Sequence, residues 1–285
     1  MKILRLGLAL GGALGIALAL SVAGCHESPV RRQAAPTTTI EPLPEPSAVI
    51  PPSTPPKRPS AAELLALPDA TPRSEPRARL GNPAFYEVYG QRYTVLAQSH
   101  GYLERGVASW YGPDFHGEKT STGESYDMFS MTAAHRTLPL PAYAHVTNLR
   151  NGHSVVVRVN DRGPFKANRI IDLSYAAALK LDMVREGTTL VEVEAIDPQG
   201  PVPAAPRPSD LYAQAGAFSV AANAQKLRER LAGQGIANVQ VQSDTSRDPP
   251  WYRVRVGPIR SVADYDATVA RLKALGIPSP TLVAN

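Results

Sequence analysis

The distribution of proline constrains this chain more than any other feature of its sequence. Thirteen of the 28 prolines lie before residue 80, and five more lie within the eleven residues 198–208. Segments rich in Pro, Ala, Ser and Thr bury too little apolar surface to offset the entropy of ordering. The pattern therefore predicts a disordered, extended spacer over residues 25–80, a short linker over 198–208, and folded parts over 81–197 and 209–285.

The N-terminus has the pattern of a secretory signal, because Lys2 and Arg5 come before an apolar run at 6–23. The run ends in Val22–Cys25, which resembles the lipobox of bacterial lipoproteins. In that family the chain is cleaved before the cysteine, which then carries the lipid. The resemblance implies a signal peptide over 1–24 and lipidation of Cys25, the single cysteine. A buried thiol is the alternative. His26 is not the aspartate that favours inner-membrane retention in enterobacteria, so the outer membrane is the expected location.

Charge and motif patterns exclude several classes of function. The formal net charge is +5, but no basic run is dense enough to predict nucleic-acid binding. The chain has no phosphate loop, dinucleotide fingerprint or nucleophile elbow. No pair of histidines or cysteines has the spacing of metal ligands, so neither a metal nor another cofactor is expected.

The segment 81–197 has the pattern of short strands. A glycine turn divides 86–96 into two strands, and Asn151-Gly152 indicates a hairpin between 143–149 and 154–160. Further strands are predicted at 106–111 and 188–196. Asp172-Leu173-Ser174 has capping residues that open a helix continuing to 183. Many short strands with one helix predict a small, mostly β barrel.

The segment 209–285 contains an internal duplication with an offset of 41 residues. Gly216 corresponds to Gly257, Leu231 to Leu272, and Ile236 to Ile277, to name three of the pairs. Each half follows a strand–helix–strand pattern. Two such βαβ units sharing one sheet predict a small ferredoxin-like domain with one open sheet face.

Several blocks in the first folded segment carry a specific resemblance: Ala108–Gly112, Phe115–Gly117, Thr120, Gly123-Glu124, Asp127, Thr132–His135, Thr137–Pro139, Val146–Asn148 and Val159–Phe165. In order and spacing they resemble the rare lipoprotein A family, septal lytic transglycosylases with a six-stranded double-psi β-barrel. The resemblance covers residues 86–196. The stretches 212–218 and 252–258 resemble a SPOR domain, a family that binds glycan strands stripped of their stem peptides.

The resemblance implies a lipid-anchored, periplasmic enzyme of septal wall processing and daughter-cell separation. Its barrel over 81–197 would cleave peptide-stripped peptidoglycan strands endolytically and leave 1,6-anhydro ends. Its SPOR domain over 209–285 would hold these strands. We expect a monomer whose partners are the glycan and the membrane.

Asp161 is the first candidate for the chemistry. In lytic transglycosylases the 6-hydroxyl of muramic acid is the nucleophile, so one carboxyl can act as acid and then as base. Asp161 ends the apolar strand 155–159, where contact with the barrel wall could raise its pKa. The alternative is a turn aspartate that binds backbone amides before Gly163-Pro164.

Three further residues join the predicted catalytic set because the resemblance places them in the site. Glu124 and Asp127 are three residues apart, so they could share a face and a proton, or they could lie in a solvated acidic loop. His135 could donate to a carboxylate or to the substrate, although a lone histidine is more often structural.

The predicted substrate-binding residues are less specific. Trp110, Tyr111 and Phe165 would stack on sugar rings or fill the barrel core, and His116 would contact glycan or shape a turn. The open sheet of the second domain would present Gln214, Phe218, Trp251, Tyr252, Arg253 and Arg255 to glycan, although half of these could face the helices instead.

Two classes of function remain open from the sequence. One is the lytic transglycosylase. The other is a non-catalytic wall-binding or wall-loosening protein, since the same barrel resembles that of expansins and a fold does not settle function. The joint presence of Glu124, Asp127, His135 and Asp161 favours the enzyme.

Overall fold

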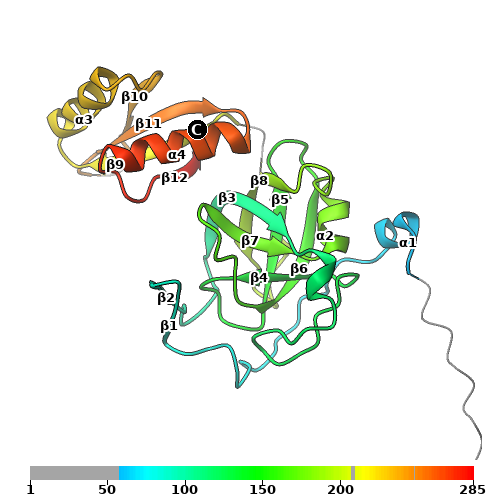
Figure 1. Ribbon diagram of the computed structural model, residues 1–285. Coiled ribbons are helices and arrows are strands. Elements are labelled where there is room, and N and C mark those ends of the chain that lie inside the picture. The colour runs from blue at the N-terminus through cyan, green and yellow to red at the C-terminus, as the bar shows by residue number, and fades with distance from the viewer. Residues whose placement is uncertain (1–57, 207–208, 247) are drawn as a thin grey trace, which may run out of the picture. The chain divides into compact units, whose positions relative to one another are not determined.

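The computed structural model describes residues 58–206, 209–246 and 248–285. The predicted signal peptide, Cys25 and most of the predicted spacer lie outside these residues. Within them, no helix is both long enough and apolar enough to cross a membrane. The elements in chain order (Figure 1) are α1 (Ala61–Leu65), β1 (Phe85–Val88), β2 (Gln91–Thr94), β3 (Leu103–Trp110), the 3-10 helix η1 (Pro113–Phe115), β4 (Thr132–His135), β5 (Ala142–Asn148), β6 (Ser154–Asp161), β7 (Arg169–Leu173), α2 (Tyr175–Lys180), β8 (Thr188–Ala195), β9 (Leu211–Phe218), α3 (Ala221–Gly233), β10 (Val239–Asp244), β11 (Trp251–Ile259), α4 (Val262–Ala274) and β12 (Thr281–Ala284).

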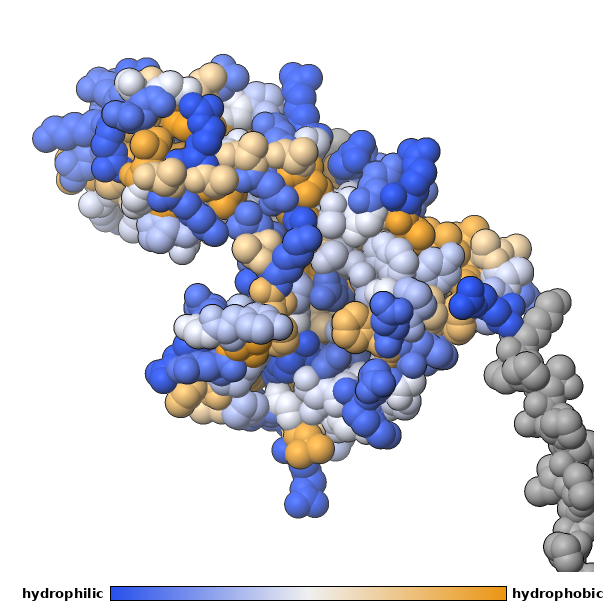
Figure 2. Space-filling model, in the orientation of Figure 1, coloured by the Kyte–Doolittle hydropathy of each residue, from blue (hydrophilic) through white to orange (hydrophobic). Residues whose placement is uncertain are grey.

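The first folded part is a closed barrel with the strand order β3-β7-β4-β6-β5-β8. The pairs β3–β7 and β4–β6 are parallel, and the other neighbours are antiparallel. Val157, Val159, Ile171 and Leu173 are fully buried in its core, so hydrophobic burial holds the sheet closed. On the face shown in Figure 2, hydrophilic side chains surround separate small groups of hydrophobic ones. The predicted six-stranded barrel is confirmed.

The sequence patterns did not predict two of the barrel strands, β4 and β7. Strand β4 has only four residues, two of them alanines, and β7 runs directly into a helix. The side chain of Ser174 accepts a hydrogen bond from the backbone N–H of Ala177 and caps α2. The prediction that Asp172 and Leu173 open this helix is therefore wrong, because both residues end β7 instead.

Residues 58–83, which we call the strap, are not the disordered spacer that their composition predicts. Helix α1 begins at a capping box formed by Ser60 and Glu63, and Leu64 is only 2% exposed within the barrel core. Asp69 accepts a hydrogen bond from the backbone N–H of Val156 at 2.8 Å and forms an ion pair with Lys180. The prediction of disorder to residue 80 is wrong here because tertiary contacts, which composition does not report, offset the ordering entropy.

The second folded part is a four-stranded antiparallel sheet with the order β10-β11-β9-β12. Leu231 and Leu272, from α3 and α4, are fully buried against Ala213 and Val254 of the sheet. Each half runs strand–helix–strand, as the duplication predicts. The two βαβ units and their shared sheet are confirmed.

Candidate active site

Asp161 lies at the end of β6, where a loop folds over it. Its Oδ1 accepts hydrogen bonds from the backbone N–H of Ser121 at 2.7 Å, from Ser121 Oγ at 2.6 Å and from the backbone N–H of Arg162 at 2.7 Å. Its Oδ2 accepts one from the hydroxyl of Tyr111 at 3.3 Å. The bond from Arg162 is the turn contact that the alternative interpretation expects, but the loop and Tyr111 add donors from elsewhere. Asp161 is thus an acceptor held in one orientation.

A second carboxyl, which the sequence patterns missed, lies beside Asp161. Ala134 on β4 pairs with Asp161 on one side and with Asp172 of β7 on the other. Residues directly opposite in a sheet share a face, so the two carboxyls flank the small side chain of Ala134. A Cβ added at Gly163, two residues after Asp161, would lie 3.9 Å from Asp172 Oδ2 and 3.8 Å from the Ala134 Cβ, so the turn after Asp161 packs against both residues.

The surroundings of Asp172 favour its protonated form. Ser109, opposite on β3, donates a hydrogen bond to Asp172 Oδ1. Burial raises the pKa of Asp172, and the negative charge of Asp161 raises it further, against the lowering effect of Ser109 and Arg169. No local sequence pattern marks its role, because Asp172 lies two residues before the helix cap Ser174 and is readily assigned to the start of the helix instead of the end of a barrel strand.

Tyr111 packs against two other aromatic rings, and its predicted stacking on a sugar ring stays a prediction. Its ring centroid lies 4.8 Å from that of Tyr126 and 5.8 Å from that of Phe115. Burial raises the pKa of the Tyr111 hydroxyl, and the nearby charges of Asp161 and Asp172 add to this effect. A hydroxyl that keeps its proton remains a donor, so Tyr111 orients Asp161.

Glu124 and Asp127, the two loop carboxylates, have separate partners. Arg158 Nη1 donates to both oxygens of Glu124, at 3.0 and 2.8 Å, and Asn160 Nδ2 donates at 2.7 Å. Burial alone would raise the pKa of Glu124, but these hydrogen bonds outweigh it and the pKa is lowered. Asp127 accepts from the backbone N–H of Phe129 at 3.0 Å and from Ser130 Oγ at 2.7 Å. The suggested shared proton is therefore not what holds either group.

His135 lies inside the barrel wall, only 1% exposed. Its Nδ1 accepts hydrogen bonds from the backbone N–H groups of Thr137 and Leu138, at 3.2 and 3.0 Å. Its Nε2 lies 2.8 Å from the hydroxyl of Tyr102. Burial lowers the pKa of His135 to about 3, with smaller contributions from Arg136 and Arg162. The predicted contact with substrate is wrong for this conformation, because both ring nitrogens are used to fix the chain after β4.

Trp110 and His116 lie in a row of aromatic rings. The ring of Trp110 lies 5.5 Å from that of Tyr175, Tyr175 lies 6.5 Å from Phe129, and Phe129 lies 5.5 Å from His116. Trp110 is half-buried against the barrel core, which agrees with its predicted core role, and its stacking on a sugar ring stays a prediction. His116 Nδ1 accepts from the backbone N–H of Met128 at 3.2 Å, which is a turn contact.

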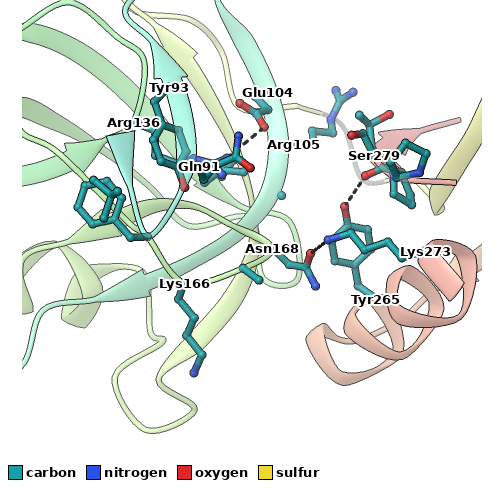
Figure 3. A pocket seen from close by; sticks show the side chains of 18 of the residues that line it. Gln91, Tyr93, Glu104, Arg105, Arg136, Lys166, Asn168, Tyr265, Lys273 and Ser279 are labelled. Carbon is teal, nitrogen blue, oxygen red and sulfur yellow. Dashed lines mark hydrogen bonds and ion pairs between the residues drawn. The ribbon is translucent and has the colours of Figure 1, made fainter. Parts of the chain in front are cut away.

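Phe165 belongs to a second aromatic cluster, on the loop that follows Asp161. Its ring centroid lies 6.2 Å from Tyr86 and 5.8 Å from Tyr93, on the hairpin β1–β2. The guanidinium of Arg136 lies 5.9 Å above Tyr93 and 4.0 Å from Glu104, and Figure 3 shows Arg136 between these two residues. Phe165 is half-buried, so it too is partly available to a ligand.

One face of the sheet in the second domain carries four of its six predicted glycan-contact residues; Trp251 is exposed on it, whereas Arg255 is only 7% exposed. Arg255 pairs directly with Gln214, and Arg253 and Trp251 share its face because side chains alternate along a strand. Arg253 also forms an ion pair with Asp244 at 2.7 Å. Phe218 and Tyr252 pair with each other and pack on the helix side, so their predicted place on the open face is wrong.

Comparisons with known proteins agree with this architecture. Residues 103–193 match the family model described as lytic transglycolase, and residues 208–284 match that of the SPOR domain. An endolytic peptidoglycan transglycosylase RlpA of Pseudomonas aeruginosa is 36% identical, over 78% of this chain and 82% of the relative. A protein with the same curated name from Neisseria meningitidis is 42% identical, over 76% of this chain and 90% of the relative.

The identity, the coverage of both chains and the order of the barrel and the SPOR domain point the same way. The chain belongs to the rare lipoprotein A family.

Proposed function

We propose that this protein is an endolytic lytic transglycosylase that cleaves peptidoglycan glycan strands in its barrel domain. The curated names of its relatives support the reaction class. The observation that carries the proposal is the pair Asp161 and Asp172, which flank Ala134 from two strands. One is surrounded by donors and the other has a raised pKa. A pair whose environments differ in this way assigns an acid and a base.

In the proposed reaction, protonated Asp172 gives its proton to the glycosidic oxygen as the bond from that oxygen to C1 of the muramic acid breaks. The 6-hydroxyl of the same sugar then attacks C1. Asp161 accepts the proton released from that hydroxyl, and a 1,6-anhydro ring closes. One proton has moved from Asp172 to Asp161, and its return between the adjacent carboxyls, or through solvent, resets the site. This divides between two residues the work that sequence analysis assigned to Asp161 alone.

Glu124 contributes a fixed negative charge rather than a proton, because Arg158 and Asn160 donate hydrogen bonds to its carboxylate form. Such a preorganised charge stabilises the positive charge that develops on the sugar ring during cleavage.

The remaining features suit a wall enzyme. We infer that lipidated Cys25 holds the protein at the periplasmic side of the envelope, in the outer membrane, and that the SPOR domain enriches it at the division septum. Trp251, Arg253, Arg255 and Gln214, which share one face of the sheet, would bind peptide-stripped strands, and the barrel would cut these same strands during daughter-cell separation.

The test is incubation of the purified protein with peptide-stripped sacculi, followed by mass analysis of the soluble products. Products with 1,6-anhydro ends support the enzyme, and an Asp161→Asn variant should yield few of them while still binding the sacculi. Binding without any such product from the wild-type protein would instead favour the non-catalytic wall-binding function.

A further inference from the structure

The strap contacts the loop that carries Glu124 through one arginine. Glu75 accepts hydrogen bonds from Arg158 Nε and Nη2, each at 2.9 Å, and from the hydroxyl of Tyr143 at 2.5 Å. The side chains of Glu75 and Arg158 are only 18% and 19% exposed. This is a bidentate, charge-assisted contact, which fixes orientation as well as adding energy.

The other side of the same guanidinium holds Glu124. Arg158 Nη1 donates to both oxygens of that carboxylate, while Nε and Nη2 stay on Glu75. A guanidinium is planar and rigid, so binding one edge fixes where the other edge points. The orientation of Glu124 therefore depends on a residue of the strap, 49 positions earlier in the chain.

We propose that Glu75 of the strap is a positioning residue for catalysis, which fixes Glu124 through Arg158. This inference rests on the proposed transglycosylase function, because it assigns a consequence for turnover to a contact outside the residues 103–193 that match the family model.

A second contact of the strap lies on the side of Asp161. Gly81 has a φ of +76°, and a Cβ there would lie 2.9 Å from the carbonyl oxygen of Ser121. Arg162 Nε donates to the carbonyl oxygen of Gly81 at 2.8 Å. Ser121 and Arg162 are the residues whose N–H groups hold Asp161. The strap thus contacts residues that hold Glu124 and residues that hold Asp161.

The experiment compares two strap variants in the full chain. Glu75→Gln removes the negative charge that pairs with Arg158 but keeps the shape of the side chain. Asp69→Asn is the matched control, because Asp69 anchors the strap through Val156 and Lys180, whose contacts do not involve Arg158. A misplaced catalytic group can cost up to about 10²-fold in rate. We expect Glu75→Gln to lower kcat about tenfold with little change in KM, and Asp69→Asn to stay within about twofold.

Two further readouts separate positioning from stability. The hydrogen bonds from Arg158 lower the pKa of Glu124 more than repulsion from Glu75 raises it, so Glu75→Gln, which releases Arg158, should move the acid limb of the pH–rate profile to higher pH. In a Glu124→Gln background the added Glu75→Gln change should have little further effect, since the residue it positions is already altered. A tenfold loss in both backgrounds, or an equal loss in Asp69→Asn, would overturn the inference.

Failure of the proposed function would look different, because the wild-type protein would then yield no anhydro products. In that case amide hydrogen exchange over residues 118–127 decides the positioning role. Faster exchange of this loop in Glu75→Gln than in Asp69→Asn supports it, and equal exchange in the two variants contradicts it.

Discussion

Replacing Asp172 with asparagine should separate stability from catalysis, because the two are expected to change in opposite directions. Asparagine is nearly isosteric with aspartate, and its side-chain oxygen can still accept the hydrogen bond from Ser109. It carries no transferable proton. General acid catalysis by a positioned side chain contributes roughly 10²–10⁴-fold in rate, which corresponds to about 3–5 kcal/mol of barrier. We therefore expect kcat to fall by about this factor while KM changes little.

The expected gain in stability follows from the direction of the pKa shift. A carboxyl whose pKa is raised on folding binds its proton more tightly in the folded state, so its contribution to stability falls as pH rises from its unfolded pKa through its folded pKa. At neutral pH, above the unfolded pKa of about 3.9, the wild-type protein bears this penalty and the Asp172→Asn variant does not. The variant should melt at a higher temperature at pH 7, and the difference should vanish below about pH 4.

The assay pairs a thermal melt with turnover of peptide-stripped glycan per folded molecule. Near-normal turnover by a stable Asp172→Asn protein would refute the role of Asp172 as the acid. A lower melting temperature at pH 7 would refute the account of its environment.

Three further predictions concern other parts of the chain. Cys25→Ser should accumulate as a full-length precursor that a fatty-acid probe does not label, and a labelled product cut before residue 25 would contradict lipidation there. Residues 209–285 alone should fold and bind peptide-stripped sacculi in a pull-down, and equal binding to intact sacculi would contradict the proposed preference. The pKa of His135 is lowered to about 3 on folding, so its share of the stability is fully present above about pH 6.5 and is lost as pH falls toward 3. His135→Gln should therefore flatten the dependence of unfolding free energy on pH between these values in chemical denaturation, and an unchanged slope would count against burial as its cause.

The sequence predicted the elements that carry a periodic pattern or a turn signal. The Asn151-Gly152 hairpin, the alternating strand β8 and the duplicated βαβ units follow from local chemistry alone. Strands β4 and β7 were missed because four residues with two alanines, or a strand joined directly to a helix, have no distinctive period. Their parallel pairings join strands that lie far apart in the chain.

The candidate site shows the same division. Asp161 and Glu124 could be chosen from residue type and family resemblance, but the partner of Asp161 could not, since Asp172 becomes its neighbour only when two strands pair on either side of Ala134. His135 was predicted to be catalytic because its position in the motif does not reveal that its side chain is buried. Charge pairing across 83 residues, from Glu75 to Arg158, leaves no local pattern at all.

The strap also bears on how fragments of such enzymes are chosen. A fragment that begins at residue 103, where the family model begins to match, would lack Leu64 from its core and Glu75 from Arg158. It would expose an apolar gap in the barrel and leave one edge of a largely buried guanidinium without its carboxylate, a costly arrangement. Weak or absent activity in such a fragment would therefore report on the cut rather than on the enzyme, and a fragment beginning before Arg58 is the smallest one whose inactivity would be informative.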